Sequence, residues 1–340
     1  MFQILILIII ILILNFILFK YNILFSNKLN LFDEPNSSRK LHKNPVPLNG
    51  GIFYFFNITF MFVYDYFFNN LKISLFFGLE NEIEIIYFFL IIFSLLFIGI
   101  IDDKLSLKPL TKTSLSLLLF FSFLFINKSF HISELRFESF SKVIDLFNIS
   151  LIFTIVCLCI LQISFNMYDG INLQSSIYYS TLSLFFFIIT DNYGLKLFCI
   201  FTIIYLICFS IYNYKSKIFL GDNGVYIFSF IFSLIIIKIY NTSSKLYVES
   251  ILILLLFPFL DLIRLFLVRL RNNTNPFEGD RNHIHHILFN KFGLVRSNLI
   301  LIFPLIVSII LLYKFNFNLV AILFVKILIY LFLIKKKTNE

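Results

Sequence analysis

Charged residues are scarce in this chain, and their scarcity excludes an ordinary soluble domain. Only 14% of the 340 residues are Asp, Glu, Lys or Arg, whereas 59% are hydrophobic. Soluble domains hold about 25% charged and about 45–50% apolar residues. A soluble fold would have to leave much of this Phe, Ile and Leu in contact with water. The composition therefore indicates a chain whose solvent is a lipid bilayer.

Cysteine is also rare, and its placement argues against a disulfide or a zinc site. Cys157, Cys159, Cys199 and Cys208 all lie inside apolar runs with no histidine nearby. Cysteines in such surroundings act as small hydrophobic residues.

The N-terminal apolar run lacks the basic segment and small-residue cleavage site of a signal peptide. We therefore expect a retained transmembrane helix there.

Long apolar runs dominate the remaining sequence. A transmembrane helix needs about 20 mostly apolar residues. We predict an all-α fold, a polytopic transmembrane helical bundle of about 11 spans (10–11), with residues 1–340 forming a single integral membrane domain. The second run is the weakest, because Asn57 and Asp65 interrupt it. The runs lie near residues 2–25, 50–68, 85–101, 112–127, 148–165, 174–190, 195–213, 224–240, 249–268, 297–313 and 318–334.

Basic residues are divided unevenly between the two sides of this bundle. If the N-terminus lies outside, the inner segments hold 19 of the 28 Lys and Arg residues and the outer segments hold 8. Because basic residues favour the cytoplasmic side, we expect the N-terminus outside and the C-terminus in the cytoplasm. The net charge of +9 then reflects topology and anionic headgroups, and no nucleic-acid partner is expected.

Five polar clusters all fall on the predicted inner side, near residues 26–51, 102–112, 166–174, 214–224 and 269–297. Charges at a membrane are costly, so charged residues at helix ends favour a functional interpretation. We therefore expect these segments to be cytoplasmic active-site loops.

The first cluster is basic. Arg39, Lys40 and His42 precede two prolines and the pair Gly50–Gly51. Basic side chains bind phosphate, and glycines allow the backbone a close approach. The alternative is a positive-inside anchor followed by a turn.

The second cluster is the pair Asp102 and Asp103 at the end of the third run. Adjacent carboxylates repel each other unless a cation or a shared proton offsets their charge. Mg²⁺ prefers such carboxylates together with phosphate oxygens. The alternative is a solvated helix end beside Lys104.

The third and fourth clusters resemble turns. Asn166 and Asp169-Gly170 follow one apolar run, and Gly221-Asp222-Asn223-Gly224 precedes another. Plain turns explain both patterns. Asp222, however, lies where it can cap a helix or hold a metal ion.

The fifth cluster contains three of the five histidines of the chain, His283, His285 and His286, just after Asp280 and Arg281. Imidazole and guanidinium groups close together indicate metal or phosphate contact. Zinc is one candidate, but the acidic clusters elsewhere fit a hard cation better. The parts together suit phosphoryl transfer, whose catalysis depends on positioning and charge stabilisation.

In these clusters the chain resembles the polyprenyl-phosphate N-acetylhexosamine-1-phosphate transferases, a glycosyltransferase 4 type family that includes WecA-type enzymes and MraY translocases. Five short motifs occur in the family's order between Asp33 and about Gly293. Ile284 separates the histidines, as in the WecA-like branch, whereas the MraY branch is expected to have three contiguous histidines. Asn172, Leu173 and Val225 depart from the family's common acidic residue, Gly and Ser.

The resemblance implies a Mg²⁺-dependent reaction, with Mn²⁺ as an alternative metal. A UDP-linked amino sugar, GlcNAc or a related one, would pass its sugar-1-phosphate to undecaprenyl phosphate and release UMP. This is a first step in making a lipid-linked cell-surface glycan such as O-antigen, at the cytoplasmic face of the bacterial inner membrane. A homodimer is a further hypothesis.

The resemblance also implies roles for individual residues. Asp102, Asp103 and Asp169 would be catalytic, and Asp222 with Asp102 would hold the metal. The residues expected to bind substrate are Arg39, Lys40, His42, Asn166, Arg281, His283, His285 and His286.

Two alternatives remain, a transporter or flippase and an inactive scaffold. A transporter would carry polar groups near mid-membrane and on both faces. Here the predicted helix centres hold little charge and the clusters are one-sided, which favours the enzyme. The intact acidic and histidine motifs argue against a scaffold.

Overall fold

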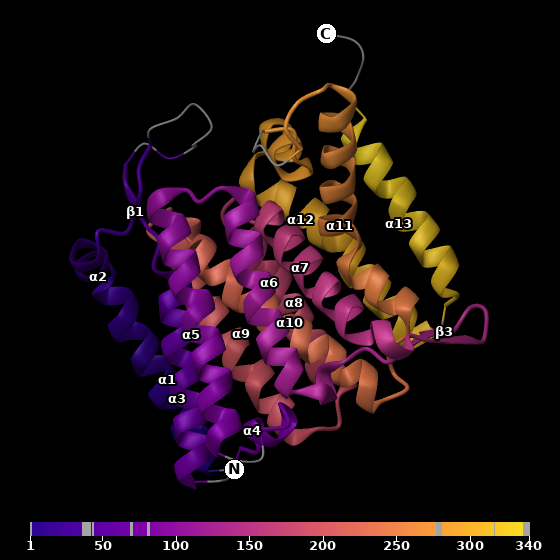
Figure 1. The fold of residues 1–340 in the computed structure, drawn as a ribbon. Coiled ribbons are helices and arrows are strands. Elements are labelled where there is room, and N and C mark those ends of the chain that lie inside the picture. Colours follow the sequence, from indigo (N-terminus) through magenta and orange to yellow (C-terminus); the bar gives the residue numbers. More distant parts are fainter. Residues whose placement is uncertain are drawn as a thin grey trace.

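The computed structural model describes residues 2–35, 42, 44–68, 71–79, 82–276, 281–315 and 317–335. These residues form a bundle of helices with two small two-stranded sheets (Figure 1). The N-terminal half comprises α1 (Phe2–Lys20), α2 (Asn22–Leu29), β1 (Phe32–Asp33), β2 (Val46–Pro47), α3 (Gly50–Phe68), α4 (Ile73–Phe76), α5 (Glu82–Leu105) and α6 (Pro109–Ile126). The rest comprises η1 (Lys128–Phe130), β3 (Glu134–Phe137), β4 (Lys142–Asp145), η2 (Phe147–Ile149), α7 (Ser150–Tyr168), α8 (Gln174–Ile189), α9 (Tyr193–Tyr214), α10 (Gly221–Thr242), α11 (Val248–Arg271), α12 (Ile284–Phe315) and α13 (Leu319–Ile334).

The polytopic helical fold is confirmed, since every predicted apolar run contains a helix. Within the described ranges, eight helices are long and apolar enough to cross a membrane. A ninth span is added if α1 and α2, bent by 57° relative to each other, are counted together. α8 and α13 are apolar but have only 16 residues each. Eleven spans and an outer N-terminus therefore remain predictions.

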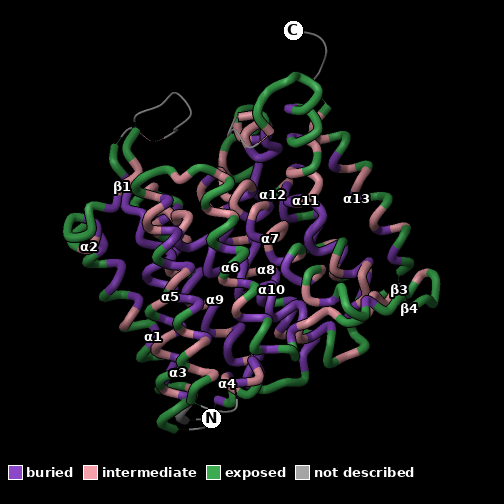
Figure 2. The backbone as a smooth tube through the Cα atoms, viewed as in Figure 1, coloured by how far each residue is buried: buried purple, intermediate pink, exposed green. Residues whose placement is uncertain are grey.

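α10 forms the centre of the bundle. It packs against α5, α3 and α7, and 94% of its most apolar stretch is buried (Figure 2). Aromatic rings tie it to its neighbours. The ring of Phe228 stacks on that of Tyr54 with centroids 3.8 Å apart, and on that of Tyr179 at 4.6 Å. The N-terminus of α10, which carries Asp222, is thus held by the core.

The polar residues that weaken the second predicted span are paired inside the bundle. The amides of Asn57 and Asn15 exchange two hydrogen bonds, of 2.9 and 3.0 Å, between α3 and α1. The Asp65 carboxylate accepts the backbone N–H groups of residues 71–74, at 2.8–3.1 Å, and so caps α4. Polar groups with such partners are tolerated in an apolar helix, and the run forms the whole of α3.

The bundle has two distinct ends. α1 begins at the lower end in Figure 1, the end at which α4 also lies, and the β3–β4 hairpin lies low on the right-hand side. β1 and the connection between α11 and α12 lie at the upper end. The connection between α6 and α7 contains an antiparallel hairpin, β3–β4, in which Glu134 pairs with Asp145.

Candidate active site

Two cavities bring the five polar clusters together. The larger, of about 650 Å³, is lined by residues from all five clusters, among them His42, Asp102, Asp103, Asp169, Asp222 and His286. The smaller, of about 350 Å³, is lined among others by Lys112, Asn166, Asp169, His283, His285 and His286. Because Asp169, Gly170 and His286 line both, the two cavities adjoin. Segments far apart in sequence thus converge on one site.

Asp103 joins the end of α5 to the beginning of α10. Its carboxylate accepts the backbone N–H groups of Asp222, at 2.8 Å, and Asn223, at 3.2 Å. It also accepts the Asn223 side-chain amide at 2.5 Å. A carboxylate at a helix N-terminus satisfies unpaired donors and interacts favourably with the helix dipole. Asp103 therefore acts as a cap supplied by a neighbouring helix, and it fixes the position of Asp222.

Glycine makes this junction possible. A Cβ atom at Gly99 would collide with the backbone of Asn223, and one at Gly51 would collide with the backbone of Gly224. The small residues let α3 and α5 approach the start of α10 closely enough for the Asp103 cap to form.

Asp102, one residue earlier, is buried and turned toward α6 and α10. Its carboxylate accepts the Lys112 ammonium at 2.9 Å, the Tyr226 hydroxyl at 2.7 Å and the Leu107 backbone N–H at 2.9 Å. Neither Lys112 nor Tyr226 was predicted from the sequence as a site residue. A lysine inside the first turn of an apolar helix, just after an Asp-Asp pair, was the signal available for Lys112.

Asp222 faces the same lysine from the other side. Its Oδ2 lies 4.0 Å from Lys112 Nζ, and its Oδ1 accepts a hydrogen bond from the Asn166 amide. The carboxylates of Asp102, Asp103 and Asp222 thus meet beside a single lysine among the described residues that line the cavities. Such an excess of negative charge suits a divalent cation bound through oxygen.

Asp169 follows α7, at the boundary between the two cavities. Its Oδ1 accepts the Ser175 hydroxyl at 2.6 Å. Burial raises the pKa of its carboxyl to about 6, and the Ser175 hydrogen bond offsets this only in part. Gly170 beside it lies against the ring of His285, where a Cβ atom would collide. The Asp-Gly pair therefore brings an acid and an imidazole together.

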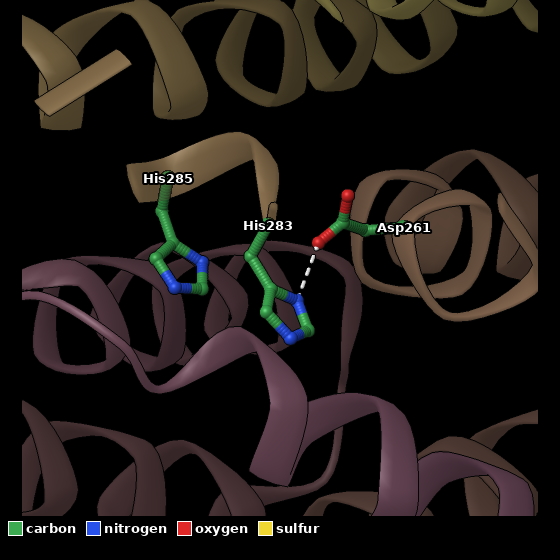
Figure 3. A group of neighbouring side chains, drawn as sticks. All are labelled: Asp261, His283 and His285. Atoms are coloured by element: carbon green, nitrogen blue, oxygen red, sulfur yellow. Dashed lines mark hydrogen bonds and ion pairs between the residues drawn. The ribbon is translucent and has the colours of Figure 1, made fainter. Parts of the chain in front are cut away.

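The histidine cluster lies where the chain enters α12. His283 and His285 are buried, and their rings are nearly parallel with centroids 5.2 Å apart. His283 Nδ1 lies 2.9 Å from Oδ2 of Asp261, which comes from α11 (Figure 3). One ligand atom of each of Asp261, His283 and His285 lies within 4.8 Å of the others, a spacing at which a metal ion can bind.

Asp261 was not identified from the sequence. It lies in the middle of an apolar run, and its partner His283 is brought to it only by the fold. The available signal was an acid inside a predicted span, followed three positions later by Arg264, with which it forms an ion pair of 2.7 Å.

The remaining predicted site residues are placed as follows. His42 lines the larger cavity, and its Nε2 lies 3.0 Å from the backbone oxygen of Asp33. Arg281 precedes the histidines but is not among the described residues that line the two cavities. Arg39, Lys40 and Asp280 lie outside the described residues.

The fold and the site define a class of protein, namely a multi-pass membrane protein with acidic and imidazole groups gathered at one end of its bundle. Comparison with known proteins shows which family within this class the chain is similar to. Residues 85–240 match the family model of glycosyl transferase family 4.

The chain is also similar to proteins named undecaprenyl-phosphate alpha-N-acetylglucosaminyl 1-phosphate transferase. It is 26% identical over 290 residues to that of Salmonella typhi, 25% over 295 residues to that of Escherichia coli strain K12, and 24% over 294 residues to that of Yersinia pestis. The matches cover 81%, 82% and 81% of this chain and 73%, 74% and 74% of those proteins. The resemblance indicated by the five motifs is thereby confirmed.

Proposed function

We propose that this protein transfers an N-acetylated amino sugar 1-phosphate from a UDP-sugar to undecaprenyl phosphate, with GlcNAc-1-phosphate or a related sugar as the group moved. One observation carries the proposal: five carboxylates, one lysine and four histidines of the described residues, drawn from separate segments, line two adjoining cavities of a membrane bundle. The names of the similar proteins support the same reaction.

The reaction is a displacement at phosphorus. An oxygen of the lipid phosphate attacks the phosphorus that carries the sugar, and a new P–O bond forms. The bond between that phosphorus and the bridging oxygen of the donor diphosphate breaks, and UMP leaves with this oxygen and the electron pair. The protein mainly has to align two anionic substrates and stabilise the charge that develops on their oxygens.

Mg²⁺ is part of this proposal, and the residues fit it. We assign Asp222 and Asp102 as its ligands, with Mn²⁺ as the alternative ion. Both carboxylates face Lys112, at 4.0 and 2.9 Å, and Asn166 orients Asp222 through an amide hydrogen bond. Bound Mg²⁺ supplies positive charge to the phosphate oxygens.

The other side chains surround that centre. Asp103 keeps the start of α10 in place beside the reacting phosphates. Lys112 balances the carboxylates and is placed to contact a phosphate. Asp169, between the cavities, is assigned as the base that receives a proton from the lipid phosphate. His283, His285 and His286 line the smaller cavity, where we place the donor diphosphate. Arg281, two positions before His283 in the chain, is assigned as a further phosphate contact.

The location follows from the substrates. UDP-sugars are soluble and undecaprenyl phosphate is held in a bilayer, so the site has to open at a membrane surface. We place it at the cytoplasmic face of the bacterial inner membrane, which agrees with the charge bias of the predicted inner segments.

A UMP-release assay tests the function. Purified protein in detergent is incubated with undecaprenyl phosphate, Mg²⁺ and a panel of UDP-sugars, each with and without the lipid. We expect UMP to form with one donor or a few donors, and only when the lipid is present. No UMP with any donor, from protein shown to be folded, would favour the transporter or flippase interpretation.

A further inference from the structure

Asp261 lies outside the lining of both cavities but contacts one of their histidines. It is 2% exposed and lies in the middle of α11. A buried carboxylate in a membrane helix is costly unless several donors satisfy it. The hydrogen-bond partners of Asp261 therefore indicate the role of this carboxylate.

The Asp261 carboxylate is surrounded by donors. Its Oδ1 accepts Arg264 Nη2 at 2.7 Å, the Tyr330 hydroxyl at 2.9 Å and the Ile284 backbone N–H at 3.2 Å. Its Oδ2 lies 2.9 Å from His283 Nδ1. An ionised carboxylate only accepts hydrogen bonds, so the His283 contact requires a proton on Nδ1.

The proton on Nδ1 determines what His283 presents to the cavity. Figure 3 shows Nδ1 directed at Asp261 and the other ring nitrogen, Nε2, directed away from it. His283 lines the smaller cavity together with Lys112 and Asp169. Nε2 is thus the ring nitrogen left for a ligand in the cavity.

A second set of contacts holds Asp261 in position. Arg264 donates to the backbone oxygen of Asn282 at 2.6 Å and to the Tyr330 hydroxyl at 2.9 Å. These bonds connect α11, α13 and the segment that carries the histidines. α13, which lies far along the chain from the carboxylates of the site, is thereby linked to the orientation of the His283 ring.

We propose that Asp261 is a positioning residue that fixes the orientation and Nδ1 proton of His283, so that Nε2 is the ring nitrogen that faces the diphosphate of the UDP-sugar donor. The role of His283 in this inference rests on the proposed function. The proton on Nδ1 does not, and it can be measured without turnover.

The proton position is tested by nitrogen NMR of the ring. Full-length protein in detergent, labelled with ¹⁵N-histidine, is compared with the His283→Ala variant to assign the signal. We expect Nδ1 of His283 to carry a proton in the wild type and to lose it in Asp261→Asn, whose amide N–H₂ replaces the acceptor. An unprotonated Nδ1 in the wild type overturns the inference and is the result expected if a metal ion binds Asp261, His283 and His285. Should Asp261→Asn not fold, the wild-type spectrum decides.

The action through His283 is tested by a double-mutant cycle. We expect Asp261→Asn to lower kcat/KM for the UDP-sugar about 10–100-fold, mainly through KM. In a His283→Ala background the same change should cost less than about 2-fold, since the interaction is already gone. Equal losses in both backgrounds would assign Asp261 a merely structural role.

Asp65→Asn is the matched control. Asp65 is also a buried carboxylate that accepts several N–H groups, but it caps α4 away from the site. We expect this variant to lower the melting temperature and to leave kcat/KM of the folded protein unchanged. If the wild type releases no UMP, the proposed function fails, while the NMR result still decides the contact between Asp261 and His283.

Discussion

Neighbouring carboxylates in this site have different partners, and this difference predicts different effects of mutation. Asp103 is used by three N–H donors at the start of α10. Asp222, on that same helix, has one amide donor and a lysine at 4.0 Å, and it lines the larger cavity. Oxygen atoms with few protein donors are those available to a metal ion and a phosphate.

Asp222→Asn is expected to lower kcat at least about 100-fold, because an amide supplies no charge to a metal ion. The melting temperature without Mg²⁺ should stay near the wild-type value. Asp103→Asn, in contrast, should lower the melting temperature, since losing the cap destabilises α10 by about 0.5–2 kcal/mol. UMP-release rates and thermal unfolding in detergent measure both. Near-normal turnover of Asp222→Asn would remove it from the metal site.

The raised pKa of Asp169 predicts that both stability and kcat depend on pH. Burial raises its pKa from 3.8 to about 6, so the folded protein binds its proton more tightly than the unfolded chain does. Its contribution to stability is therefore full below the unfolded pKa and is lost as the pH rises to about 6. As a base Asp169 must be ionised, so kcat should rise with pH through that value. Asp169→Asn should be slow and lack this rise, and a rise that persists in the variant would point to another group.

At the scale of elements, the contact between α5 and α10 determines the geometry of the site. Gly99 leaves no room for a side chain against the backbone of α10. We expect Gly99→Val to destabilise the protein by about 1–3 kcal/mol or more and to abolish transfer. Ser94→Ala on the same helix is the control and should behave like the wild type, since the Ser94 hydroxyl donates to the backbone oxygen of Leu90 in its own turn. Thermal unfolding and UMP release of both variants provide the measurement.

The helices were predictable from apolar length, because a membrane span needs an uninterrupted run of such residues. The break between α1 and α2 was not, since Tyr21 and Asn22 carry none of the Pro or Gly that mark a bend. The break is explained by a contact in the fold, because the Asn22 side-chain amide donates a hydrogen bond to the backbone oxygen of Lys217, 195 positions away. The β3–β4 hairpin was missed for a similar reason, because Tyr240 of α10 bonds to the backbone of Glu134.

The candidate site was predictable only in part. Short motifs marked the acids and histidines, because charge at a helix end is unusual in a membrane protein. Lys112, Tyr226 and Asp261 lie within apolar helices, where nothing local shows which partner they meet. Their roles depend on helix packing across long sequence separations.

For the whole molecule, the charge bias predicts one orientation in the membrane. We expect eleven spans with the N-terminus outside, so that the β3–β4 hairpin and the connection after α11 lie on opposite sides. In a variant whose native cysteines are replaced, an impermeant maleimide should label Lys142→Cys in intact spheroplasts and label Asn272→Cys only after lysis. The reverse pattern would place the acidic cavity outside, where UDP-sugars are absent.

In the proposed reaction a sugar-1-phosphate, and not the sugar alone, moves to a lipid phosphate. The measurement is transfer from UDP-GlcNAc, or from the donor that the UMP assay selects, labelled with ³²P at the phosphorus next to the sugar. We expect the label to enter the lipid fraction with undecaprenyl phosphate and Mg²⁺, and EDTA or Asp222→Asn to prevent this. Label that stays with the nucleotide while the sugar moves would contradict it.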